Sequence, residues 1–248
     1  MANVLLSIDF DFFVPEKPRW DLGHCEDEMF LKMMWTTRGH LIPEMKTDGN
    51  EKDFWKRLPW HIPASQDVFV SDSHLLAYHL TKDTDHIVLI DRHHDCFEWP
   101  TTKGPFQVDC GNWAAVWLSA CAKRKLLWVH PDDLSTDDLE IPVHTCRERI
   151  LAVPYSRFCK MRLTRDLKCP NLTIHVCRSG CWVPPWLDQD FVNFVKASGL
   201  TPQVMQEGVW DPMKHRWNLD DYETARQLTE ACRKLRKPEK VVALTKPL

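Results

Sequence analysis

The chain has 248 residues, a hydrophobic fraction of 44% and a formal net charge of -3, which predict a folded globular protein with a substantial core. Its positive and negative charges are interspersed, so the sequence lacks the basic stripe that nucleic-acid binding requires, and we expect no nucleic-acid partner. The ten cysteines follow no metal-binding or secreted-disulfide spacing, and no apolar run has the length of a membrane span or the form of a signal peptide, so we expect a cytoplasmic protein with reduced thiols and no membrane partner.

Strand-like and helix-like patterns alternate along the chain. The segment 36–64 has no clear period and is predicted to be a long excursion, a kind of segment that often carries function. Strands that alternate with helices indicate an α/β fold, with a single domain over 1–248 and a mostly parallel sheet flanked by helices. The predicted strands are 4–8, 68–70, 87–90, 126–131, 150–153 and 172–176, and the predicted helices are 25–34, 73–80, 112–122, 187–197 and 222–235.

Two of the predicted strands end in acidic clusters. The first strand runs into Asp9 and Asp11, and the third runs into Asp91, His93 and Asp95. Residues i, i+2 and i+4 of an extended segment project to one side, so the members of each cluster share a face and the intervening residues point away. Both clusters should meet beyond the carboxyl ends of the strands, where parallel sheets bind ligands. Five oxygen and nitrogen ligands exceed the need of one ion, and this ligand type suits Mn²⁺, so two manganese ions are predicted.

Either cluster, taken alone, is also compatible with a role other than metal binding. Asp9 and Asp11 could form a strand-end turn or the nucleophile pair of a haloacid-dehalogenase-type phosphatase, although Phe12 and Phe13 stand where that motif has Gly-Thr or an equivalent. The second cluster alone could be a polar loop. The presence of both clusters in one chain favours a metal centre.

Together, DFD at 9–11 and DRHHD at 91–95 resemble the ligand motifs of the arginase and deacetylase superfamily. The stretch VSDSHLLAYHL places His74 where that family has a histidine ligand at the start of a helix. Arginases place the Asp-x-Asp strand late in the chain, whereas here it is the first predicted strand. The resemblance therefore implies an arginase-like sheet with a rearranged strand order.

The resemblance also implies how two manganese ions are held, with Zn²⁺ or Fe²⁺ as alternative ions. A water activated between the ions would attack the guanidinium carbon of arginine, and urea would leave. Asp95 would be the catalytic proton carrier. No residue of DCGNWAAV matches the family's catalytic histidine, so the proton donor to the leaving amine is unassigned. Carried over by motif, the bridging ligands are Asp9 and Asp91, the further ligands of one ion are His74 and Asp95, and those of the other are His93 and Asp11.

Substrate binding needs an acidic side chain, because the metal charge repels a guanidinium group. Glu98, which closely follows the second cluster, is the first candidate. Arg178 and Ser179 follow the last predicted strand and should reach the same rim; Arg178 either binds a substrate carboxylate or peptide carbonyl or forms a structural salt bridge. The alternatives to Glu98 are Asp21, Glu26 and Glu28.

The segments GNWAAVWL, LLWVHP and LTIHVCRSGCWVPP are similar to the peptide-arginase branch, whose members convert arginine residues of ribosomally made precursor peptides to ornithine. This similarity implies an arginine-containing peptide as substrate, and leaves open a leader peptide and a homo-oligomer. The alternatives are a ureohydrolase for free arginine or agmatine, a deacetylase-like amide hydrolase with one zinc ion, and a non-catalytic binding protein stabilised by metal.

Overall fold

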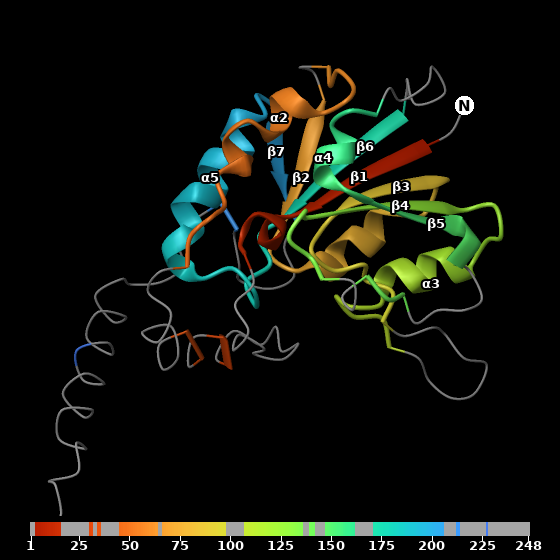
Figure 1. Cartoon of the computed structure of the whole chain (residues 1–248), viewed down its shortest axis with the longest axis horizontal. Coiled ribbons are helices and arrows are strands. Elements are labelled where there is room, and N and C mark those ends of the chain that lie inside the picture. Colours follow the sequence, from red (N-terminus) through yellow and green to blue (C-terminus); the bar gives the residue numbers. More distant parts are fainter. Residues whose placement is uncertain are drawn as a thin grey trace, which may run out of the picture.

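In the computed structural model of the protein, the described residues are 3–15, 30–31, 34–35, 45–63, 66–97, 107–135, 139–141, 147–161, 171–205, 212–213 and 227. Within these residues, seven strands, all parallel, form one sheet in the order β5-β4-β3-β1-β6-β2-β7 (Figure 1). The α/β class and the parallel sheet expected from the sequence are thereby confirmed. The strands are β1 (Asn3–Asp9), β2 (Asp67–Ser71), β3 (His86–Ile90), β4 (Lys125–His130), β5 (Ile150–Pro154), β6 (Asn171–Cys177) and β7 (Thr201–Val204).

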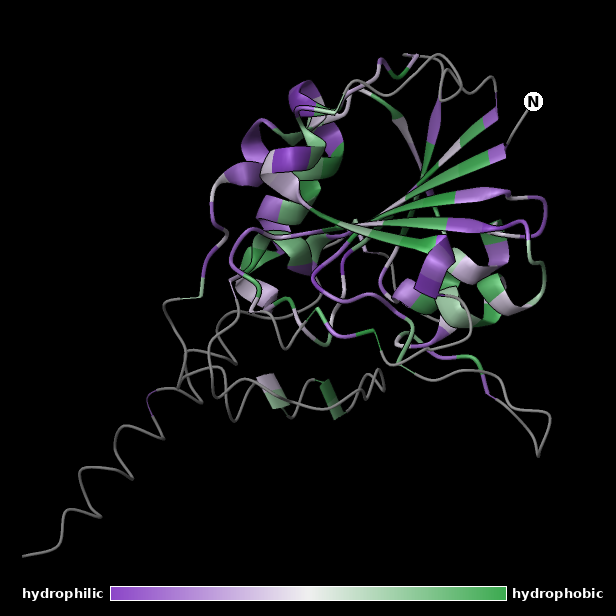
Figure 2. Ribbon diagram, turned by 45° about the vertical axis from the view of Figure 1, so that its right-hand side comes forward, coloured by the Kyte–Doolittle hydropathy of each residue, from purple (hydrophilic) through white to green (hydrophobic). Residues whose placement is uncertain are grey.

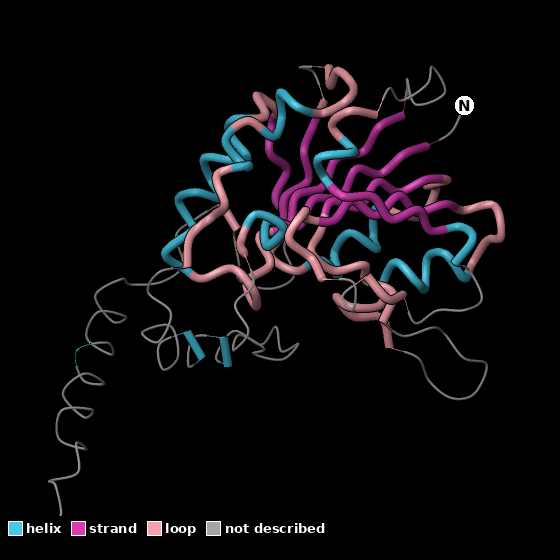
Figure 3. The backbone as a smooth tube through the Cα atoms, in the orientation of Figure 1, coloured by secondary structure: helices cyan, strands magenta, loops and turns pink. Residues whose placement is uncertain are grey.

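The first strand, β1, lies at the centre of the sheet, between β3 and β6 (magenta strands in Figure 3). Its register pairs Ile8 with Ile90 of β3 and Ser7 with His175 of β6. Both faces of the sheet are covered, which explains why β1 reads as an almost continuous apolar run rather than an alternating one.

Helices cover both faces of the sheet, and two apolar cores result (Figures 1 and 2). The first core contains Leu6 and Ile8 of β1 and is closed by α2 (Phe54–Arg57), α4 (Tyr155–Phe158) and α5 (Asp188–Ala197). The second contains Leu5 and is closed by α3 (Trp113–Ser119) and η4 (His74–Leu80). Further short 3₁₀ helices of the described ranges are η1 (Phe10–Phe13), η3 (Asn50–Lys52), η5 (Arg147–Arg149) and η7 (Pro185–Leu187).

The helices differ in detail from the sequence expectations. The helix expected at 73–80 is the 3₁₀ helix η4, and the one expected at 112–122 is shorter, as α3. The helix at 187–197 is confirmed as α5, and Gly199 follows it with φ 69°, the left-handed conformation that ends helices. The described part of the excursion, 45–63, contains η3 and α2, so this part is not without secondary structure. The expected helices at 25–34 and 222–235 lie largely outside the described residues.

The strand β7 was not expected from the sequence. Its four residues, TPQV, are all exposed, and a proline in an apolar or alternating pattern argues against a central strand. Its position at the edge of the sheet, beside β2, accommodates these residues. Within the described ranges, none of the helices combines the length and apolarity that a membrane span requires.

Candidate metal centre

All six side chains predicted as metal ligands lie together at the carboxyl edge of the sheet. Asp9 is the last residue of β1, and Asp91 directly follows β3. Because Ile8 pairs with Ile90 in the parallel register, Asp9 and Asp91 leave the sheet side by side. His74, the predicted ligand that belongs to neither acidic cluster, is the first residue of η4.

The first group of ligand atoms surrounds the imidazole of His74. Its Nδ1 atom lies 2.9 Å from Asp91 Oδ2, 3.0 Å from Asp95 Oδ2 and 3.3 Å from Asp9 Oδ2. Neighbouring ligands of an octahedral ion with bonds of about 2.1 Å are about 3 Å apart. These spacings are therefore the ones expected of atoms that share a cation, and Asp9, His74 and Asp91 form a group able to hold one.

The second group consists of Asp11, Asp91 and His93. His93 Nδ1 lies 3.1 Å from Asp11 Oδ2 and 3.7 Å from Asp91 Oδ1. Asp91 thus presents Oδ2 to the first group and Oδ1 to the second, which is the arrangement of a bridging carboxylate. Of the two predicted bridges, Asp91 belongs to both groups and Asp9 to the first.

The site concentrates negative charge out of contact with water. Burial, followed by the charge of Asp11, raises the pKa of Asp9 from its usual 3.8 to about 6. Burial also raises the pKa of Asp91 well above its usual value, with Asp95 as the next cause. Burial lowers the pKa of His93, but contact with Asp11 outweighs it and raises this pKa to about 10. Without cations the cluster must therefore bind protons, which metal ions would displace.

Several ligand atoms have no other partner. His74 Nδ1, Asp91 Oδ2 and both carboxylate oxygens of Asp11 are buried without a hydrogen bond that satisfies them. Leaving such atoms unsatisfied costs free energy, and coordination of a cation removes the cost. The four carboxylates and two imidazoles of the site therefore fit divalent cations by both charge and donor type.

The residues between the ligands face elsewhere, but not by the predicted alternation of an extended strand: Asp11 lies in η1, and β3 ends at Ile90, before the second cluster. Arg92 binds Asp133, with Nη2 3.2 Å from Asp133 Oδ1. The ring of His94 accepts a hydrogen bond from the backbone N–H of Cys96 at 2.9 Å, and burial lowers its pKa to about 4. His94 therefore stays neutral near pH 7, and unlike its neighbour His93 it is not part of either ligand group.

A small cavity adjoins the ligands. Its volume is about 20 Å³, which accommodates about one water molecule. Ser179, predicted to bind substrate, lies on its wall. The cavity is lined by Asp9, His74, His93, Asp95, Phe97, Cys110, Gly111, Ser179 and Trp182.

Arg178, the neighbour of Ser179 in the chain, is buried. Its Nε donates to Asp188 Oδ1 at 2.6 Å, and Nη1 lies 3.6 Å from Asp72 Oδ1. Of the two roles the sequence allows for Arg178, this position favours the structural salt bridge over substrate binding. The candidates for holding a guanidinium group, Glu98, Asp21, Glu26 and Glu28, lie outside the described residues.

Sequence reasoning missed the residues that support the ligands. Trp113 donates its indole N–H to Asp95 Oδ2 at 2.6 Å. Ser7 and His175 bond to each other, and Ser7 also bonds His74. The available signal was a polar residue inside an apolar strand, Ser7 in LLSID and His175 in LTIHVC. Burial of that kind requires partners, but the sequence alone does not show which ones.

Comparison of the chain with protein-family models, with curated proteins and with solved structures found no match. The arginase-like assignment therefore stays a prediction that rests on the motifs of the chain. The structure itself shows an α/β fold in which buried aspartates and histidines could hold metal ions.

Proposed function

We propose that this protein is a dinuclear manganese hydrolase that cleaves the guanidinium group of arginine residues in a peptide, giving ornithine and urea. The observation that carries the proposal is the pair of ligand groups that share Asp91. Four carboxylates balance the charge of two divalent ions, and an oxygen-rich site with some imidazole suits Mn²⁺, with Zn²⁺ and Fe²⁺ as alternatives.

Two such ions would supply Lewis acidity and a reactive nucleophile from water at neutral pH. The chain contributes a one-water cavity, with Asp95 on its wall. In the proposed reaction, oxygen of water bonds to the guanidinium carbon and the bond from that carbon to the side-chain nitrogen breaks. Asp95 takes up a proton from the water, and both water protons end on the leaving nitrogen, so the products are neutral urea and a protonated ornithine side chain.

The cavity is too small for a guanidinium group, so the substrate must approach over its rim. Phe97 is 46% exposed there, and the ring of Trp182 lies 5.0 Å from that of His93. Aromatic faces attract guanidinium groups, which supports a cationic substrate at this rim. The preference for a peptide over free arginine rests on the similarity of 172–185 and two other segments to the peptide-arginase branch.

The test is urea release by manganese-loaded protein, given free arginine or an arginine-containing peptide. We expect urea from the peptide. His93→Asn should reduce the rate roughly 100-fold or more, because it removes a ligand of the second group. His94→Asn is the matched control: it changes the neighbouring buried histidine, and an asparagine oxygen can still accept from the N–H of Cys96. This variant should keep most of the activity.

Each other outcome is informative. Urea from free arginine at the same rate as from the peptide would mean a small-molecule ureohydrolase. Bound manganese without urea from either substrate would contradict the proposal, and release of acetate from an acetylated amine would then favour an amide hydrolase. Equal loss in His93→Asn and His94→Asn would contradict the assignment of His93 as a ligand.

A further inference from the structure

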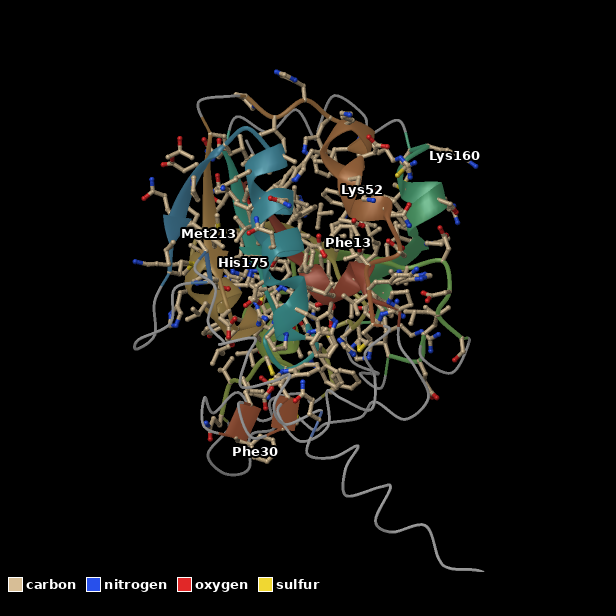
Figure 4. The ribbon with its side chains drawn as sticks, turned by 90° about the vertical axis from the view of Figure 1, so that its left-hand side faces the viewer. Phe13, Phe30, Lys52, Lys160, His175 and Met213 are labelled. Atoms are coloured by element: carbon tan, nitrogen blue, oxygen red, sulfur yellow. The ribbon has the colours of Figure 1, made fainter. Side chains whose placement is uncertain are left out.

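A row of buried polar side chains runs from His74 into the interior of the sheet. Ser7 Oγ lies 2.8 Å from His74 Nε2 and 3.0 Å from His175 Nδ1. His175 Nε2 lies 2.7 Å from Ser71 Oγ, which donates to the carbonyl oxygen of Ser73 at 2.9 Å. All the side chains in this row are at most 3% exposed, and Figure 4 labels His175 inside the molecule.

The direction of each hydrogen bond follows from the end of the row. The carbonyl of Ser73 can only accept, so the single hydroxyl hydrogen of Ser71 is used there. Ser71 Oγ must then accept from His175, which places a hydrogen on Nε2 of that ring. The other nitrogen of a neutral His175 accepts, so Ser7 donates to it and in turn accepts from Nε2–H of His74. Nδ1 of a neutral His74 is thus left with its lone pair.

Burial disfavours a doubly protonated His175, so the neutral ring assumed for this chain of hydrogen bonds holds. Both ring nitrogens of His175 bond serine hydroxyls, so a positive charge on this ring would be buried without a counter-ion in contact. The lone pair of His74 Nδ1 points at three carboxylate oxygens within 3.3 Å, an arrangement that is repulsive unless a proton or a metal ion lies between them. The row therefore leaves Nδ1 of His74 as the ring nitrogen that is available to a metal ion.

We propose that His175, with Ser7 and Ser71, is a positioning unit that fixes His74 as the Nε2–H tautomer and so directs its Nδ1 to the metal ion of the first group. The three residues come from β1, β6 and β2, which are adjacent in the sheet, so the ligand is oriented by the sheet interior. The inference rests on the metal-binding part of the proposed function and is independent of the substrate. Histidine ligands oriented in this way typically lose 10–100-fold in metal affinity when the supporting partner is removed.

The first experiment measures Zn²⁺ affinity by calorimetry. His175→Phe keeps a planar ring but removes both hydrogen bonds, and we expect affinity for the more tightly held ion to fall about 10–100-fold. Ser71→Ala is the milder second variant, in case the first does not fold, and should lose about tenfold. Thr84→Val is the control: it removes a buried hydroxyl that bonds the carbonyl of Leu80, at the other end of η4, and should leave the affinity unchanged.

The second experiment reads the tautomer directly. In Zn²⁺-loaded protein with ¹⁵N-labelled histidine, NMR should show His74 protonated at Nε2 and metal-shifted at Nδ1. Coordination through Nε2, or unchanged Zn²⁺ affinity in folded His175→Phe and in Ser71→Ala, would overturn the inference. Wild-type protein that binds Zn²⁺ with the expected tautomer but releases no urea with Mn²⁺ would overturn the proposed reaction and support this inference. Wild-type protein that binds neither Zn²⁺ nor Mn²⁺ would overturn both.

Discussion

Asp95 has an unusual backbone conformation at the edge of the metal centre. Its φ of 49° is left-handed, a conformation that aspartate tolerates better than most residues. The start of α3 holds it there: the backbone N–H groups of Ala114 and Ala115 donate to its carbonyl, at 3.2 and 3.3 Å, and Trp113 donates to its carboxylate. A left-handed conformation of a residue other than glycine costs about 1–3 kcal/mol, so it persists only where the surrounding structure holds it in place. Such residues cluster at functional sites.

The indole of Trp113 should matter for metal binding through this single hydrogen bond. Trp113→Phe keeps a buried aromatic ring but removes the donor to Asp95, so we expect Mn²⁺ affinity to fall about tenfold. Trp117→Phe is the control on the same helix, because Trp117 is equally buried and its indole nitrogen has no hydrogen bond. Calorimetric titration with Mn²⁺ decides the matter, and equal affinities of the two variants would contradict a supporting role for Trp113.

The turn after β6 is the element that joins the metal edge to α5. Ser179 adopts φ 60°, and its carbonyl accepts from the N–H groups of Trp182 and Val183. Arg178 spans from this turn to Asp188 in the first turn of α5. A buried ion pair of this kind contributes little by itself, but removal of one partner leaves a buried charge that is poorly compensated.

Asp188→Ala should therefore lower the free energy of unfolding by about 3–5 kcal/mol. Asp190→Ala is the control: it removes a carboxylate from the same first turn of α5 that is only partly buried, and it should cost about 0.3–1 kcal/mol. Chemical denaturation monitored by tryptophan fluorescence measures both. Unchanged stability of Asp188→Ala together with weakened peptide binding would show that Arg178 acts on substrate after all.

The elements best predicted from the sequence are those whose local pattern has one structural solution. β1 and β3 are apolar runs that end in acidic clusters, and both the strands and the gathering of the ligands followed from that pattern. The sequence predicted a helix at 73–80 but not its type, because a segment this short does not show whether its turns hold about 3.0 or 3.6 residues; it is a 3₁₀ helix. The pairing of Ser7 with His175 could not be predicted, because it depends on β6 lying beside β1.

For the molecule as a whole, the buried site links metal binding, protons and stability. In metal-free protein the raised pKa of His93 stabilises the fold fully below pH 6.5, and this contribution is lost as pH rises towards about 10. The raised pKa of Asp9, about 6, also stabilises the folded state at low pH, because the folded state binds a proton that the unfolded state has lost. This contribution is lost as pH rises from 3.8 to about 6. Since metal ions replace these protons, the metal-loaded protein should not show this decline above neutral pH.

Thermal unfolding between pH 6.5 and 9.5 tests this relation. We expect the unfolding temperature of the protein in EDTA to fall as the pH rises, and that of the Mn²⁺-loaded protein to fall less. The difference between the two unfolding temperatures should therefore widen with pH. In EDTA, His93→Asn should flatten the decline because the titrating group is absent. Parallel curves with and without Mn²⁺ would contradict the link between protons and metal at this site.

The central position of β1 also has a consequence for how the chain reaches its native state. Asn3 pairs with Asn171, so an apolar strand translated early acquires its second neighbour only after most of the chain has been synthesised. Contacts between such distant positions form slowly, and an unpaired apolar edge invites pairing with other chains. All six candidate ligands have been translated by residue 95. Of the strands β1, β2 and β6, which carry the row of polar side chains behind His74, β6 with His175 is translated last. Nascent or truncated chains that end before β6 should therefore aggregate, and their ligands should lack the oriented His74 of the completed sheet.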